Sequence, residues 1–88
     1  MYHEITIKPT SGGFGEYEAG TELSDGWADE TDLHHEMAGN VDEMVELGVD
    51  EIPEEVEDIR GRIRNAPDRV FACRLGDYWS YHGIVFCN

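Results

Sequence analysis

The sequence predicts a small α+β fold in which an antiparallel sheet packs against two helices. Three observations lead to this prediction. Apolar and polar residues alternate near the start of the chain, two central stretches carry apolar residues at helical spacing, and residues 69–88 are rich in β-branched and aromatic side chains. A length of 88 residues fits one domain over 1–88 with a modest core.

The sheet is expected to begin with a strand over residues 2–8, where polar and apolar side chains alternate until Pro9 ends the run. Residues 10–15 are rich in Ser and Gly and indicate a turn. Residues 14–19 are then expected to form a short second strand that pairs back on the first. The N-terminal part of the sheet is therefore a single strand or a hairpin.

The first helix is expected over residues 29–47, because apolar side chains recur there at steps of three and four. These side chains are Leu33, Met37, Val41, Met44 and Leu47. Gly39 and Asn40 lie inside this stretch, and Gly costs about 1 kcal/mol relative to Ala in a helix. A kink, or a break into two short helices, is therefore an open alternative.

The second helix is expected over residues 53–64. Pro53 suits the first helical position, acidic residues follow it in the first turn, and arginines occupy the last turns, where each charge complements the helix dipole. Its buried stripe is expected to be Val56, Ile59 and Ile63.

Residues 69–88 are expected to form a hairpin. Gly76 and Asp77 suit a two-residue turn with Gly first, and a longer loop over 75–83 is the alternative. A turn about Ser80 would place Cys73 opposite Cys87 and permit a disulfide. Two cysteines are too few for a disulfide framework, so reduced thiols are expected.

Charge is the dominant feature of the composition. Twenty Asp and Glu residues against six Lys and Arg give a net charge of −14. Residues 1–59 contain eighteen acids and one base, Lys8, whereas residues 60–88 contain five Arg and two Asp. Such an asymmetry bears on partners, solubility and association rate more than on fold.

The acidic stretch over residues 29–58 is the candidate binding surface, with two tryptophans as candidate interface anchors. The candidate partner-binding residues are Asp29, Glu30, Asp32, Glu36, Asp42, Glu43, Glu46, Asp50, Glu51, Glu54, Glu55, Glu57, Asp58, Trp27 and Trp79. Rows of carboxylates on helices can imitate the phosphates of a nucleic acid. The stretch contains no Lys or Arg, so its charges are expected to meet an external basic partner. A solubilising surface, or adaptation to high salt, is the alternative.

The sequence points away from several classes of function. It contains no phosphate-binding loop, no dinucleotide fingerprint and no motif that would activate a serine, so no catalytic residue, cofactor or enzyme activity is expected. Adjacent His34 and His35 diverge on a helix, and no metal site is expected. The net charge disfavours direct binding to nucleic acid. With no membrane span and no signal peptide in the sequence, a cytoplasmic protein is expected.

Residues 12–20 carry a resemblance to a known class of proteins. Gly12-Gly13-Phe14 followed by Tyr17-Glu18-Ala19-Gly20 is similar to an N-terminal segment of an acidic anti-CRISPR protein of type I systems. In its small size and acidity the chain also resembles phage-encoded anti-CRISPR and anti-defence proteins, many of which mimic DNA. The resemblance implies an inhibitor that occupies the basic groove where a host complex takes DNA, and it assigns no individual functional residue.

Overall fold

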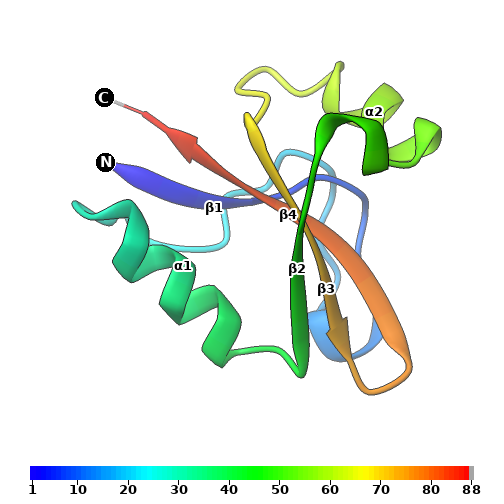
Figure 1. Cartoon of the computed structure of the whole chain (residues 1–88), viewed down its shortest axis with the longest axis horizontal. Helices are drawn as coiled ribbons and strands as arrows, with labels where there is room; N and C mark the ends of the chain where they lie inside the picture. The colour runs from blue at the N-terminus through cyan, green and yellow to red at the C-terminus, as the bar shows by residue number, and fades with distance from the viewer. Residues whose placement is uncertain (88) are drawn as a thin grey trace.

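A β-hairpin from the C-terminal part of the chain forms the centre of the sheet. In the computed structural model, which describes residues 1–87, four strands pair in the order β1-β4-β3-β2, all antiparallel (Figure 1). This arrangement confirms the predicted α+β class, with an antiparallel sheet and two helices. The elements are β1 (Tyr2–Thr6), the 3₁₀ turn η1 (Gly12–Phe14), α1 (Glu30–Gly39), β2 (Glu43–Leu47), the 3₁₀ turn η2 (Val49–Glu51), α2 (Glu54–Arg60), β3 (Arg69–Leu75) and β4 (Tyr78–Phe86).

The β3–β4 hairpin has the two-residue turn that the sequence suggested. Leu75 lies opposite Tyr78, and Gly76 has a φ of 60°, a conformation that favours glycine. In this register Cys73 lies opposite Ser80 and is buried, so it does not face Cys87. Both cysteines are free thiols.

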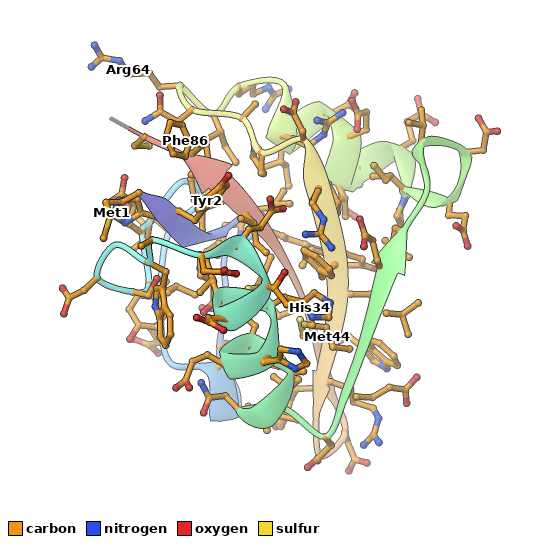
Figure 2. The ribbon with its side chains drawn as sticks, turned by 60° about the vertical axis from the view of Figure 1, so that its left-hand side comes forward. Met1, Tyr2, His34, Met44, Arg64 and Phe86 are labelled. Atoms are coloured by element: carbon orange, nitrogen blue, oxygen red, sulfur yellow. The ribbon has the colours of Figure 1, made fainter. Side chains whose placement is uncertain are left out.

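The first strand pairs with β4, and Tyr2 packs edge-on against Phe86 with their ring centroids 5.0 Å apart (Figure 2). The predicted second strand over 14–19 is wrong. Gly12 and Gly15 have φ values of 66° and 79°, which turn the backbone out of an extended path. The chain returns along the outer edge of β1 only at residues 20–27, through isolated bridges and backbone hydrogen bonds.

The predicted first helix is correct only over its first half. Asp29 caps α1 by accepting hydrogen bonds from the backbone N–H groups of Thr31 and Asp32, and the helix ends at Gly39. Residues 43–47 form the edge strand β2 and not a continuation of the helix. The break suggested by Gly39 and Asn40 therefore exists, but a strand follows it where a second short helix was the alternative.

The predicted second helix is shorter than the sequence suggested. Pro53 is its N-cap residue and not its first helical residue, and α2 ends at Arg60. Beyond Gly61 the backbone hydrogen bonds join residues three apart, such as Arg62 N–H to the Ile59 carbonyl at 3.0 Å, so the last predicted turn is 3₁₀-like. Ile63 nevertheless packs as predicted, beside Val56 and Ile59.

Each helix covers one face of the sheet, and a separate apolar cluster lies under each. The α1 face buries Leu33, Met37, Phe71, Cys73 and Ile84. The α2 face buries Ile7, Val56 and Val70, with Leu47, Ile52, Ile59, Ile63 and Tyr81 packed around them. Among residues 1–87 no helix has the length and apolar character needed to cross a membrane.

Candidate functional site: an acidic surface and its internal cations

The thirteen carboxylates of residues 29–58 are distributed over α1, β2, η2, α2 and the positions that flank them. Twelve of these residues are exposed, and only Glu30 is partly buried. In Figure 1 the chain runs without interruption from α1 through the edge strand β2 to α2, so the acids follow one path across the molecule. The acids of the stretch are thus exposed as expected, although Glu43 and Glu46 lie on the strand β2 and not on a helix.

Arg69 on β3 binds two of these carboxylates at once. Its guanidinium donates hydrogen bonds to Glu30 at 2.6 Å and to Glu46 at 2.8 and 3.0 Å, and it lies 5.1 Å from the centre of the Phe71 ring. The hydrogen bond from Arg69 lowers the pKa of Glu46, and the positive charge of Arg69 acts in the same direction. The two carboxylates together raise the pKa of Arg69.

Three other basic side chains engage further acids of the stretch. Arg74 lies 3.4 Å from Glu43 and 3.8 Å from Asp42. Arg60 lies 2.7 Å from Glu57, and Lys8 lies 3.4 Å from Glu55. The stretch itself contains no base, as the sequence shows, but the fold brings basic residues from outside the stretch to six of its carboxylates, so fewer charges are left for an external partner than the sequence suggested.

Two further acids serve the backbone. Asp29 caps α1, and Glu51 accepts a hydrogen bond of 2.8 Å from the N–H of Gly48 at the start of η2. Five acids then remain exposed and without an ion pair among residues 1–87, and we call them the free acids. The free acids are Asp32, Glu36, Asp50, Glu54 and Asp58.

The free acids occupy two separate places. Asp32 and Glu36 are one turn apart on the exposed side of α1, and Glu54 and Asp58 are one turn apart on α2, with Asp50 in the preceding η2. Neighbours at this helical spacing have Cβ atoms about 5–6 Å apart. The acidic surface therefore has two pairs of close, uncompensated charges, one on α1, which precedes β2, and one on α2, which follows it.

The two tryptophans differ in exposure. Trp27 exchanges backbone hydrogen bonds with Tyr2 and is partly buried against the α1-side cluster. Trp79 is 50% exposed and lies on the α2 face of the sheet, opposite Arg74 on β3. Of the two candidate anchors, Trp79 thus meets the condition of exposure, whereas Trp27 is partly buried.

The α2 face also carries an apolar patch beyond the end that α2 covers. Val45 on β2, Ala72 on β3 and Tyr81 on β4 form one cross-strand row, and the next row is Glu43, Arg74 and Trp79. Val45 is 41% exposed. Sequence reasoning missed Val45, because it had been assigned to a helix and not to a strand beside the hairpin.

A buried polar chain crosses the α1 face of the sheet. His82 Nδ1 lies 2.8 Å from Glu4 Oε2, and His82 Nε2 lies 2.9 Å from Ser80 Oγ. An ionised carboxylate only accepts, so Nδ1 donates to Glu4 and, in the neutral ring, Nε2 accepts from the Ser80 hydroxyl. No sequence motif joins these residues, because pairing of β1 with β4 brings Glu4 beside His82.

The order of acid, imidazole and hydroxyl is the one that serine hydrolases use. Ser80 and His82 are each only 4% exposed, and Phe14 packs on the His82 ring with centroids 5.5 Å apart. Neither residue lines the pockets of about 550 and 570 Å³, although Glu4 lines the smaller of them. We therefore assign these three hydrogen-bonded residues to the support of the core, where they satisfy one another's polar groups under η1.

The remaining titratable groups form no further centre. Burial raises the pKa of the Cys73 thiol to about 12, and the charge of Glu4 adds to this shift, so the thiol stays protonated. His34 packs edge-on against Phe71, with centroids 5.5 Å apart, and Figure 2 shows it beside Met44. No group of three or more His, Cys, Asp or Glu side chains within residues 1–87 could hold a metal ion.

Comparison of the chain with protein-family models, curated proteins and solved structures found no match.

Proposed function

We propose that this domain is a binding protein, and not an enzyme, that docks on a basic nucleic-acid-binding surface of another protein through its free acids. On this proposal it acts as an inhibitor in the cytoplasm of a host cell. Its target is a host complex that binds nucleic acid, of the CRISPR or another defence system, and the domain occupies the groove where that complex takes DNA.

The observation that supports the proposal most directly is the set of carboxylates left over after internal pairing. Four basic side chains already engage six acids of the stretch, yet Asp32, Glu36, Asp50, Glu54 and Asp58 stay uncompensated. Like charges one helical turn apart destabilise a helix by a few tenths of a kcal/mol. A basic partner would reverse this repulsion.

The free acids and the exposed patch around Trp79 would contribute differently to binding. Uncompensated charges attract a basic partner over a distance and raise the association rate, with little specificity. The exposed row with Trp79, and the neighbouring Val45, supplies an aromatic and apolar contact of the kind that dominates interface energies. The free acids of α2, Glu54 and Asp58, belong to the same side of the sheet as this patch, and together they match a basic groove with an apolar wall.

The alternative is a small acidic interaction module whose charge serves solubility. One feature favours it: β2 is an open edge of the sheet, and charged residues such as Glu43 and Glu46 protect an edge strand from pairing with other chains. In that case, changing the free acids would alter solubility and leave partner binding intact.

The test compares two variants with the same change in net charge. The first replaces the free acids by their amides. The second, the matched control, replaces five exposed acids that lie elsewhere: Glu16, Glu18, Asp25, Asp68 and Asp77. Each variant and the unmodified chain would be immobilised and used to capture partners from a bacterial lysate at low salt, followed by identification by mass spectrometry and by rate measurements with the purified partner.

We expect the unmodified chain and the control to bind the same partner, and the free-acid variant to lose binding. The association rate should fall about tenfold or more between low salt and about 0.15 M salt, because the Debye length then shortens to about 8 Å. DNA should compete for the partner. Equal binding by both variants, or equal binding to a partner already loaded with its nucleic acid, would contradict the proposal.

A further inference from the structure

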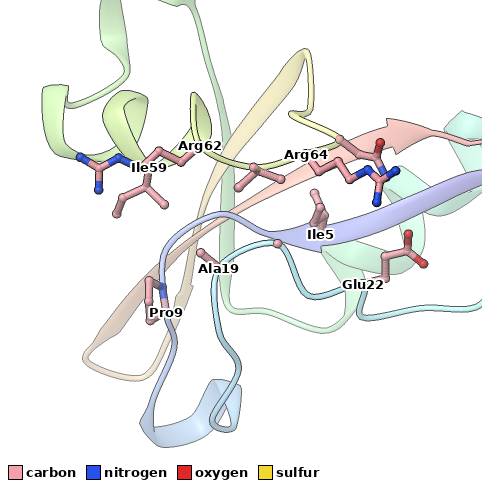
Figure 3. A pocket seen from close by; sticks show the side chains of 10 residues that line it. Ile5, Pro9, Ala19, Glu22, Ile59, Arg62 and Arg64 are labelled. Carbon is pink, nitrogen blue, oxygen red and sulfur yellow. The ribbon is translucent and has the colours of Figure 1, made fainter.

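The α2 face carries a pocket that the proposed function does not use. It has a volume of about 570 Å³ and lies between β1, the returning segment at residues 19–22 and the turn that follows α2 (Figure 3). Small-molecule sites usually measure about 300–1,000 Å³. The pocket is therefore large enough for a small organic ligand.

The walls of this pocket are held in place by backbone hydrogen bonds. On one side Gly20 N–H donates to the Thr6 carbonyl at 2.7 Å, and Thr6 N–H donates to the Thr21 carbonyl at 2.9 Å. On the other side the 3₁₀-like turn after α2 fixes Ile63, whose side chain lies 3.7 Å from the place a Cβ on Gly20 would take. The pocket walls are thus held by contacts within this protein, without a ligand or a partner.

The floor of the pocket is apolar and its rim is charged. Ile5, Ile59 and Ile63 contribute aliphatic surface, and Ile5 is only 2% exposed. Arg62 and Arg64 lie at opposite ends of the pocket in Figure 3. An apolar floor with one or two charged groups is the usual composition of a ligand site.

The two rim arginines stand apart from the other basic residues of the chain. Lys8, Arg60, Arg69 and Arg74 each lie within 4 Å of a carboxylate. Within residues 1–87, by contrast, neither Arg62 nor Arg64 makes a side-chain hydrogen bond or an ion pair. In a chain with a net charge of −14, both unpaired guanidinium groups line the same pocket.

Glu22 decides which end of the pocket suits an anion. It is the one acid among the residues that line the pocket, and Figure 3 shows it on the side of Arg64. An anion at that end meets both a positive and a negative charge, whereas the Arg62 end has no lining carboxylate. A ligand with one negative charge is therefore best placed with its head group at Arg62.

We infer that this pocket binds a small amphipathic carboxylate, with the carboxylate at Arg62 and an apolar body along Ile59, Ile63 and Ile5. A guanidinium binds a carboxylate through charge-assisted hydrogen bonds that can be bidentate. The aliphatic floor contributes roughly 25 cal/mol per Å² of apolar surface removed from water. Each part of the ligand thus meets a part of the pocket with matching chemistry.

The test is a titration of the ¹⁵N-labelled chain with octanoate, followed by NMR. Amide shifts should change and saturate at residues 19–22 and 59–65. Octylamine has the same tail and the opposite charge, and it should not bind there. Acetate has the same head group without the tail, and it should bind at least about tenfold more weakly because its apolar contact is lost.

Two variants make the same chemical change at the two ends of the pocket. Arg62→Gln should weaken octanoate binding about tenfold or more, the size expected for a lost charge-assisted hydrogen bond, and Arg64→Gln should change it less than about threefold. Both residues are exposed, so the fold should persist. Ala19→Trp, also at an exposed position that lines the pocket, should block binding without changing any charge.

Three outcomes would overturn the inference. The first is equal binding of octylamine and octanoate, which would show that charge plays no part. The second is unchanged binding in Arg62→Gln, or an equal loss in both arginine variants. The third is a set of shifts that lies outside residues 19–22 and 59–65 or that persists in Ala19→Trp.

Discussion

Arg69 lies 23 and 39 positions away in sequence from the two carboxylates that it binds, Glu46 and Glu30. Residues 29–58 taken alone show acids without bases, because the compensating arginine belongs to a strand that pairs with β2 only in the folded chain. The sequence therefore identified the acidic surface correctly but overstated how much of its charge is free. The five free acids are the part that the fold leaves without an internal ion pair.

The buried polar residues could not be foreseen for the same reason. Ser80 and His82 are two positions apart and share a face of β4, but their link to Glu4 depends on the pairing of β1 with β4. Thr6 lies opposite His82 in this pairing and is completely buried, and its hydroxyl is the one fully buried side-chain polar atom among residues 1–87 without a hydrogen-bond partner.

Replacing Thr6 and Ser80 by apolar residues of similar shape should change stability in opposite directions. Thr6→Val removes a hydroxyl that has lost water and gained no partner, so it should raise the free energy of unfolding by about 1 kcal/mol. Ser80→Ala leaves His82 Nε2 without its hydrogen-bond partner and should lower the free energy of unfolding by about 1 kcal/mol. Urea denaturation measures both. A destabilised Thr6→Val protein would show that the hydroxyl is satisfied.

At the scale of elements, the strongest sequence patterns gave the correct structures. The alternation in β1, the aromatic and β-branched residues of the hairpin, and the dipole-matched charges of α2 are local signals, and each element forms where they occur. Boundaries were less certain, since α2 ends at Arg60, just before Gly61.

The stretch from Val41 to Leu47 shows why the second half of the predicted first helix was misassigned. Met44 and Leu47 are three positions apart, a spacing that fits one face of a helix. In β2 the same spacing places them on opposite faces, with Met44 against the α1-side cluster and Leu47 against the α2-side cluster. An edge strand that contributes to two cores thus mimics a helical stripe, and only the neighbouring strand β3 distinguishes the two.

Two glycines that differ in surroundings test this description of the elements. Gly39 ends α1, and no heavy atom lies within 4 Å of the position that a Cβ would take there, so Gly39→Ala should raise the free energy of unfolding by up to about 1 kcal/mol. On Gly83 a Cβ would lie 2.4 Å from Pro67 and 2.9 Å from the Arg69 carbonyl. Gly83→Ala should therefore cost about 1–3 kcal/mol.

Chemical denaturation with circular dichroism would measure both glycine variants. Loss of stability in Gly39→Ala would mean that the end of α1 requires glycine for a reason other than helix propensity. A neutral Gly83→Ala would mean that Pro67 does not pack closely against β4.

At the scale of the whole molecule, the distribution of charge separates the binding proposal from adaptation to high salt. The apolar clusters on the two faces, together with the four paired basic side chains, give the fold sources of stability that need no screening of its negative charge. A protein adapted to high salt would depend on such screening.

We therefore expect the chain to stay folded in dilute buffer. Thermal unfolding followed by circular dichroism, from about 10 mM to about 1 M salt, should show a folded baseline at every concentration, with a moderate rise in Tm as self-repulsion is screened. Unfolding at room temperature below about 1 M salt, where the Debye length is about 3 Å, would instead support adaptation to high salt.

The strand order β1-β4-β3-β2 also determines when the molecule can fold. The first strand forms a ladder only with β4, so the pairs Tyr2–Phe86 and Thr6–His82 can form only after β4 has been synthesised. Pairings between distant parts of a chain carry a large loop-closure cost and slow folding. During synthesis β2 and β3 can pair before β4 has left the ribosome, whereas the β3–β4 hairpin and the ladder of β1 both need β4. Of these two, the hairpin has only a two-residue loop to close, while β1 pairs across nearly the whole domain. The sheet therefore closes last along the seam where the two ends of the domain meet.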